Sequence, residues 1–131
     1  MGHCIDVYLI RKSELRKEKI DNIISDEDMN KIKWTEMKEG ILATTYIPNI
    51  REFGKDKTIA KVSTDYFGGS GNQAAKLFIN NKKVYDESDE LDWKLAPINS
   101  VLSQMGISRK DGMDEFDTIG LGSYRSNSDF E

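Results

Sequence analysis

The stretch "STDYFGGSGNQAAKLFI", residues 63–79, decides the fold because it is compatible with two structures that imply different functions. Gly69, Gly71 and Ala74 follow the order G-x-G-x-x-A, which is typical of a strand that turns into a phosphate-binding helix. Alternatively, Gly68, Gly69 and Gly71 permit a tight turn between two strands. The motif G-K-[ST] does not follow these glycines, which excludes a P-loop.

The residues after the glycines favour a hairpin. Asn80 and Asn81 stand between two β-rich runs, and Asn tolerates the positive φ angles that a two-residue hairpin turn requires. We therefore predict a hairpin that joins residues 73–79 to residues 82–85. In the nucleotide-binding interpretation, Asp86 is the candidate acid for the ribose. The chain is too short for a doubly wound sheet there, because 57 residues precede the first strand and only 45 follow Asp86.

Three further segments are rich in β-branched and apolar residues, which predicts strands at residues 4–10, 41–47 and 58–67. The last of these alternates apolar and polar residues, as half-exposed antiparallel strands do. A short strand is also predicted within residues 116–124. The polar residues 49–57 are expected to form a loop.

Helices are predicted at residues 13–24 and 97–105. In the second, apolar residues recur at i, i+3, i+4 and i+7, and Gly106 with Ile107 predicts a Schellman cap. Ser25 and Asp28 have capping-box spacing, which predicts another short helix. Residues 29–39 are compatible with either helix or strand.

These elements predict one α+β domain that spans residues 1–131. Its core is a mainly antiparallel, twisted sheet of about five strands, flanked by two or three helices. A chain of 131 residues is an ordinary size for one domain.

Composition limits the classes of function. No apolar run reaches the roughly 18 residues that cross a bilayer, so no membrane association is expected. Cys4 is the one cysteine, which suits a reducing compartment, and we expect a cytoplasmic protein. Residues 1–83 carry 15 Lys and Arg against 12 Asp and Glu, whereas residues 84–131 carry 4 against 11. The acidic C-terminal third argues against nucleic-acid binding and favours a basic partner.

The residue types that carry catalysis do not converge on a site. His3 is the only histidine, and it adjoins Cys4 in a predicted strand, where neighbouring side chains point to opposite faces. No C-x-x-C pair predicts zinc, and the acidic run at residues 86–92 lacks the order of a calcium loop. We therefore expect no metal and no cofactor, and the sequence favours a protein that is not an enzyme.

The acidic run is instead the candidate partner-binding surface. Five acids in seven residues, followed by a tryptophan, suit a negative patch that docks a basic protein around an aromatic anchor. Aromatic residues beside the glycines extend this surface, with Tyr124 as a further candidate. The predicted partner-binding residues are Tyr66, Phe67, Asp86, Glu87, Asp89, Glu90, Asp92 and Trp93. The alternative is a solvated loop in which Trp93 belongs to the core.

Three runs, "TDYFGGSGNQAAKLF", "APINSVLSQMGI" and "DEFDTIGLGSYRSNSDF", support a resemblance. Residues 64–131 resemble a family of small, poorly characterised bacterial proteins that look like immunity proteins of polymorphic toxins, including contact-dependent inhibition systems. The resemblance supplies no catalytic residue. It implies an intracellular protein that neutralises a cognate toxin domain by binding it.

Two functions therefore follow from the sequence. The first is an immunity protein, a monomer or weak dimer, that binds a basic toxin domain. The alternative is a small nucleotide- or metabolite-binding protein that uses the glycine-rich loop at residues 68–74. A subunit of a larger assembly is a third possibility.

Overall fold

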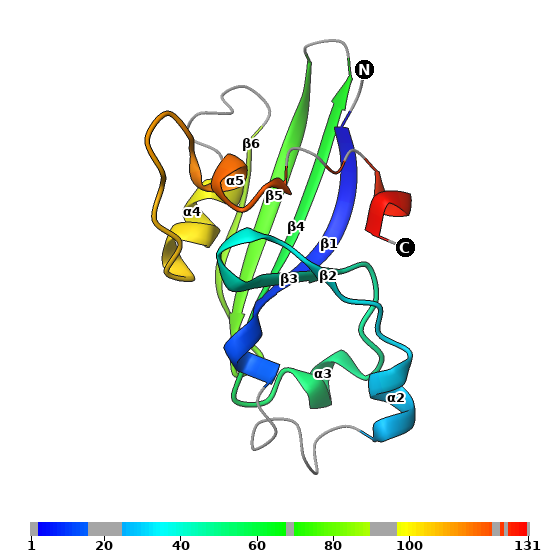
Figure 1. Cartoon of the computed structure of the whole chain (residues 1–131). Helices are drawn as coiled ribbons and strands as arrows, with labels where there is room; N and C mark the ends of the chain where they lie inside the picture. Colours follow the sequence, from blue (N-terminus) through cyan, green and yellow to red (C-terminus); the bar gives the residue numbers. More distant parts are fainter. Residues whose placement is uncertain are drawn as a thin grey trace.

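A computed structural model describes residues 3–15, 25–67, 70–89, 97–121, 124 and 126–130. Within these residues, six strands form one sheet in the order β2-β3-β1-β4-β5-β6, and all neighbouring strands are antiparallel (Figure 1). The predicted α+β class is therefore confirmed, with one strand more than expected. The strands are β1 (His3–Arg11), β2 (Thr35–Glu36), β3 (Ile41–Thr44), β4 (Thr58–Phe67), β5 (Ser70–Ile79) and β6 (Lys82–Asp89).

Strand β4 has the bounds that the sequence predicts, and β1 extends the predicted strand by one residue at each end. In β4, Ala60, Val62 and Thr64 are buried, while Lys61 and Asp65 lie on the opposite face and are more exposed. Strand β3 is shorter than predicted, because the Thr44 hydroxyl bonds to the backbone of Tyr46 and the chain turns there.

The hairpin after the glycines is confirmed. Strands β5 and β6 are joined by Asn80 and Asn81, whose φ angles are 50° and 65°, as a type I′ turn requires. Both strands are longer than predicted, and β5 already begins at Ser70. A bulge lies between Leu77 and Phe78 in the pairing with β6.

The short helix predicted at Ser25 is confirmed as α2 (Asp26–Asn30), where Ser25 Oγ accepts a hydrogen bond from Asp28 N. The helix predicted at residues 13–24 begins as a 3-10 turn, η1 (Lys12–Leu15), and its remainder lies outside the described residues. The ambiguous residues 29–39 contain the end of α2, then β2, and the start of the 3-10 turn η2 (Lys38–Gly40).

Two expectations were wrong. The predicted loop at residues 49–57 contains α3 (Ile50–Phe53), which forms because the fully buried Phe53 anchors a short turn to the core. The predicted strand at residues 116–124 is instead α5 (Glu115–Thr118), since Asn99 Oδ1 accepts a hydrogen bond from Phe116 N and fixes the first turn. A 3-10 turn, η5 (Asn127–Phe130), follows.

The amphipathic helix is confirmed as α4 (Pro97–Gln104). Ile107 N donates to Leu102 O and Gly106 N donates to Ser103 O, each at 3.0 Å, and Gly106 has a φ of 94°. These bonds complete the predicted Schellman cap.

Each face of the sheet has its own hydrophobic cluster. The larger one lies where α4 and α5 cover the sheet, and the smaller one lies on the opposite face, where α2 and α3 cover the lower end (Figure 1). Strand β1 contributes Val7 and Leu9 to the first and Ile10 to the second. The smaller cluster comprises Ile10, Ile32, Leu42, Ile47, Phe53 and Ile59, with Tyr8, Leu15, Met29, Trp34 and Ile50 packed against it.

Two buried amides hold α4 and α5 in place. Gln73 is 1% exposed, and its Oε1 accepts a hydrogen bond of 3.2 Å from Ile98 N in the first turn of α4. Asn99 donates to Asp114 Oδ2 and accepts from Phe116 N, which joins α4 to α5. Two residues of the motifs that carry the family resemblance, Gln73 and Asn99, thus have structural roles.

Candidate functional site

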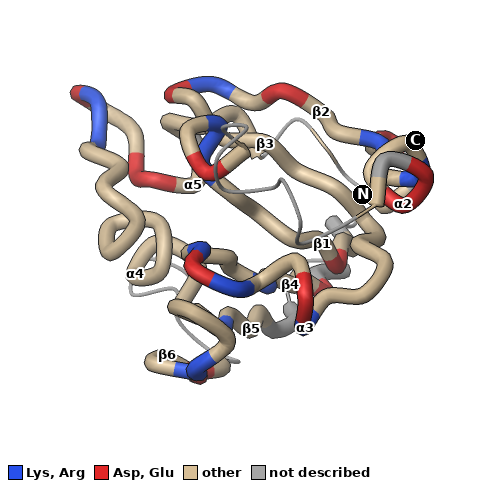
Figure 2. The backbone as a smooth tube through the Cα atoms, turned by 90° about the horizontal axis from the view of Figure 1, so that it is seen from below, with Lys and Arg blue, Asp and Glu red and all other residues tan. Residues whose placement is uncertain are grey.

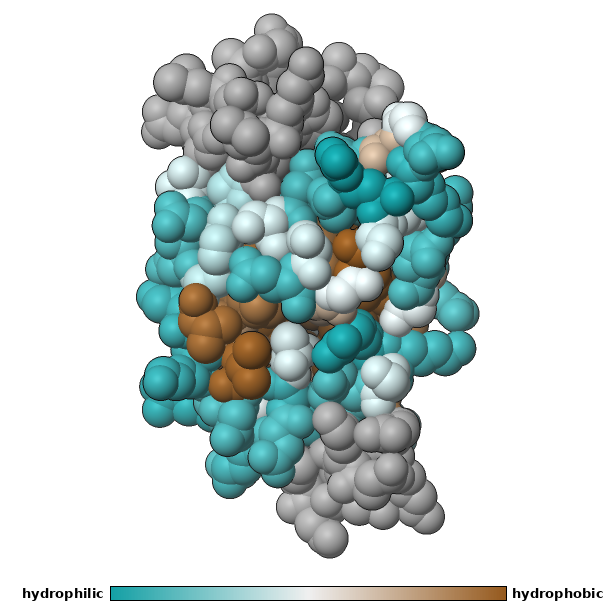
Figure 3. Space-filling model, turned by 90° about the vertical axis from the view of Figure 1, so that its left-hand side faces the viewer, coloured by the Kyte–Doolittle hydropathy of each residue, from teal (hydrophilic) through white to brown (hydrophobic). Residues whose placement is uncertain are grey.

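The acidic candidate surface lies on β6, the edge strand next to β5. Asp86 and Glu87 are both exposed, and they pair across the ladder with Lys76 and Ala75 on β5. Successive residues of a strand point to opposite faces, so the two acids give negative charge to both sides of this edge. The side of the molecule that carries β6 and α4 is mostly hydrophilic, with hydrophobic atoms confined to small areas (Figure 3).

Asp86 has a local basic partner. Lys83 Nζ donates a 2.8 Å hydrogen bond to Asp86 Oδ2. This bond, with the positive charges of Lys83 and Lys76, holds the pKa of the Asp86 carboxyl below its ordinary value, against a smaller opposing effect of desolvation. Asp86 therefore carries its negative charge throughout the physiological pH range.

The structure brings other predicted residues to one end of the sheet. Tyr66 and Phe67 end β4, where they pair with Gly71 and Ser70 of β5, and Asp89 ends β6 opposite Gln73. In the ladder, Asp89 is level with Thr64 across β5, and Tyr66 and Phe67 follow two and three residues further along β4. Gly68, Gly69, Glu90, Asp92 and Trp93 lie outside the described residues.

Tyr124 does not belong to this surface. It is half-buried, and its ring stacks on Phe130 with 4.7 Å between the ring centroids. Both rings pack with the cluster beneath α4 and α5. The expectation of an exposed recognition residue at Tyr124 is therefore corrected to a core contact.

The glycine motif has the geometry of a hairpin. Residues that would form the phosphate-binding helix of a dinucleotide site are instead strand β5, and Gly71 lies within it opposite Tyr66. A strand cannot direct a helix N-terminus at a phosphate. Gly71 and Ala74 of the G-x-G-x-x-A spacing are therefore both strand residues.

The described residues contain no group of three or more His, Cys, Asp or Glu side chains placed to hold a metal ion. Cys4 is an exposed free thiol on β1. No helix in this part of the chain is both long and apolar enough to cross a membrane.

Sequence reasoning missed a basic pocket on the sheet face opposite α4. A cavity of about 640 Å³ lies between β1, β4, β5 and the α3 segment, and its lining includes Arg51, Lys57, Lys61 and Lys76 with the rings of Tyr8 and Phe78. Seen from below, Lys and Arg residues lie next to Asp and Glu residues around α3 (Figure 2), and Asn80 N of the β5–β6 turn donates to Lys57 O. One signal of this pocket was available in the sequence. If Phe67 pairs with Ser70 in a hairpin, Lys61 must lie directly opposite Lys76.

The chain matches no protein-family model, no curated protein and no solved structure. The resemblance to immunity proteins is therefore still a prediction.

Proposed function

We propose that this protein is an intracellular immunity protein that neutralises a toxin domain by binding it along the acidic edge of β6. The observation that carries the proposal is the position of Asp86 and Glu87, which are exposed on an edge strand rather than paired in the interior. A basic active site on a toxin that attacks nucleic acid would complement this edge, and opposite charge speeds the encounter.

The edge also supplies a surface of suitable extent. Strand β6 runs for eight residues and pairs on one side with β5, so that its outer backbone groups face away from the sheet. A stable interface buries roughly 1,600 Å² in total, about half from each partner.

Partner capture tests the proposal. The tagged protein is incubated at low salt with a lysate of the cells that encode it, and bound proteins are identified by mass spectrometry. We expect one basic protein, whose recovery falls strongly with the charge reversal D86K/E87K and with added salt. The control D111K/E27K makes the same charge change at exposed acids outside β6 and is expected to leave recovery unchanged.

Two results would contradict the proposal. One is recovery of no protein partner by the unaltered chain, and the other is equal recovery by D86K/E87K. The toxin interpretation has its own test, because the captured protein should arrest growth when expressed alone and not when expressed together with this chain. If the captured protein does not arrest growth, the proposal of binding at β6 stands but the proposed immunity role is wrong.

The alternative function, ligand binding at residues 68–74, has less support. It rested on a helix N-terminus behind the glycines, and β5 occupies that place. If this loop binds nucleotides, they should raise the thermal stability of the protein, and Gly71→Val should abolish that effect.

A further inference from the structure

The basic pocket has the size and lining of a small-molecule site. Its volume of about 640 Å³ lies within the range of roughly 300–1,000 Å³ that ligand pockets occupy. The sheet contributes the floor through Tyr8, Lys61, Lys76 and Phe78, and the α3 segment contributes a wall.

The charge of the pocket opposes that of the whole protein. The chain has a net charge of −4, yet four of the residues that line the pocket are Lys or Arg and none is Asp or Glu. A concave surface lined by one sign of charge concentrates the field and attracts ions of the opposite sign. Asp6, which forms an ion pair with Lys61, and Asp86, the cross-strand partner of Lys76, lie beside the pocket and do not line it.

The register of the sheet brings two of these cations together. Lys61 on β4 and Lys76 on β5 are direct cross-strand partners, and they point to the same face. Like charges in directly opposite positions destabilise a sheet, so this pair has a cost in the free protein. Lys61 is partly compensated, because its Nζ lies 3.3 Å from Asp6 Oδ1 and 4.2 Å from the centre of the Tyr8 ring. An anion held between the two lysines would offset the repulsion.

Aromatic rings lie beside the cations. Tyr8 and Phe78 are half-buried, and both line the pocket. Flat rings of this kind stack on the bases of nucleotides and on other planar groups, which contributes to binding without selecting one base. The floor therefore combines an oxyanion site with a surface for a planar ring.

The wall of the pocket is fixed by the β5–β6 turn. Asn81 Nδ2 donates to Arg51 O at 2.6 Å, Asn80 N donates to Lys57 O at 2.9 Å, and Asp56 N donates to Asn80 Oδ1 at 3.0 Å. Gly54 contributes no side chain, and the Asn81 amide occupies the space that a Cβ there would fill. The pocket is thus largely preformed, which lowers the entropic cost of binding.

From these observations we infer that the pocket binds a small anion in which a phosphate adjoins a flat ring, the chemistry of a nucleoside monophosphate. The phosphate lies between Lys61 and Lys76, with Arg51 at the rim, and the ring stacks against Phe78, since Lys61 Nζ already lies over the Tyr8 ring. This site is separate from the glycine-rich loop, and it adjoins the acidic edge of β6 through Lys76, the cross-strand partner of Asp86.

Isothermal titration calorimetry of the full chain at low salt tests the inference with three probes, which are adenosine monophosphate, adenosine and inorganic phosphate. We expect saturable 1:1 binding of the monophosphate, and weaker binding of either half. Lys76→Gln should weaken the monophosphate at least about fivefold, the loss of one charge-assisted contact. Lys61→Gln should act in the same direction. The control Lys82→Gln removes an equal charge from an exposed residue of the same hairpin that does not line the pocket, and should leave binding unchanged.

Four outcomes would overturn the inference. Absence of heat at millimolar adenosine monophosphate would remove the site. An equal loss in Lys82→Gln would show unspecific attraction of anions to the hairpin. If inorganic phosphate binds as tightly as the monophosphate, the ring makes no contribution to binding. If adenosine binds as tightly, the lysines make none. Partner capture by the unaltered chain is independent of these titrations, and Lys61→Gln tests the pocket without changing the cross-strand partner of Asp86.

Discussion

At the residue scale, Gly54 and Asn81 determine how the α3 segment meets the hairpin. Gly54 has an ordinary φ of −76°, so space rather than backbone conformation selects glycine. A Cβ there would overlap Asn81 Oδ1 and lie 3.1 Å from Ile50 O. The Asn81 amide cannot move aside without losing its bond to Arg51 O. Asn81 therefore has two roles. The positive φ of its backbone forms the turn, and its side-chain amide holds the wall of the pocket.

This arrangement predicts a coupling between the two positions. Gly54→Ala should lower the free energy of unfolding by about 1–2 kcal/mol, from overlap and a weakened hydrogen bond. In an Asn81→Gly background, which keeps the turn because glycine tolerates positive φ, the same change should cost clearly less. Urea denaturation of the four proteins in the cycle measures the coupling energy. If the effects of Gly54→Ala and Asn81→Gly are additive, the Asn81 amide does not fill the space beside Gly54.

At the element scale, what could be predicted depended on whether the deciding contacts are local. The hairpin, the Ser25 cap and the end of α4 were predicted because their determinants, such as Asn80 and Gly106, lie within the element. The helix α5 was not, because Phe116 N meets Asn99, 17 positions away in sequence. Likewise α3 depends on burial of Phe53 in a core that the local pattern of residues 49–57 does not show.

The seat of α4 on the sheet gives a prediction of its own. Gln73→Met keeps the size of the side chain but removes the acceptor for Ile98 N, so a buried donor loses its partner. We expect a loss of about 1–3 kcal/mol in the free energy of unfolding. Hydrogen exchange should accelerate more at amides of α4 than at those of β1. Ser103→Ala, an exposed change on the same helix, is the control, and equal effects of the two variants would show that Gln73 does not hold the helix.

At the scale of the whole molecule, the acidic run at residues 86–92 is visible in the sequence but the basic pocket is not, and the reason is physical. Asp86 and Glu87 are neighbours in the chain, so their charge is visible in any local window. Arg51, Lys61 and Lys76 come from three segments, and each stands among acids in the sequence or alone. Only the register of β4 with β5 and the position of α3 bring their charges together.

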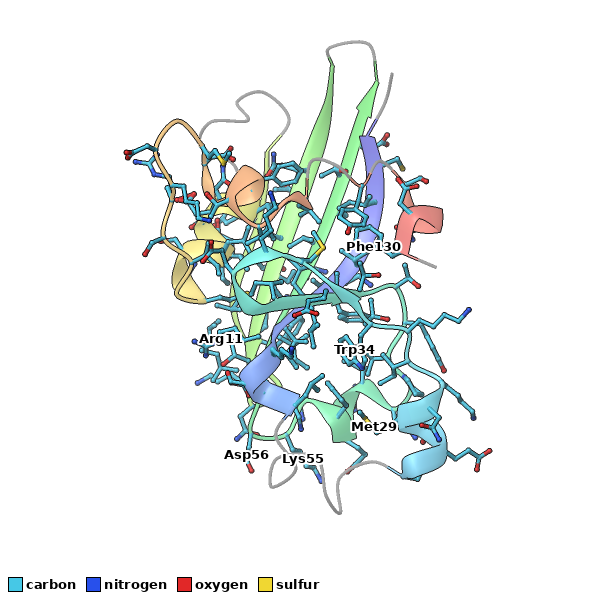
Figure 4. All side chains as sticks on the ribbon, in the orientation of Figure 1. Arg11, Met29, Trp34, Lys55, Asp56 and Phe130 are labelled. Carbon is cyan, nitrogen blue, oxygen red and sulfur yellow. The ribbon has the colours of Figure 1, made fainter. Side chains whose placement is uncertain are left out.

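The alternation of side chains along the central strands joins the two hydrophobic clusters into one structure. Neighbouring residues of β1 enter opposite clusters, since Leu9 lies beneath α4 and α5 while Ile10 lies above α2 and α3. Trp34 projects into the space between the sheet and α3, with its ring centroid 6.1 Å from that of Phe53 (Figure 4). Its fluorescence therefore reports on the smaller cluster, whereas far-UV circular dichroism reports mainly on the whole sheet.

Unfolding is accordingly expected to be one cooperative transition. In the variant Trp93→Phe, which leaves Trp34 as the sole tryptophan, fluorescence and circular dichroism should give the same midpoint in urea. Loss of the smaller cluster exposes the back of β1 and β4, and these strands also form the floor of the larger cluster, so neither cluster can persist alone. A fluorescence transition at clearly lower urea would mean that α2 and α3 detach first. In that event the pocket wall would open while the sheet stays folded, and anion binding would be lost at the first transition rather than at the second.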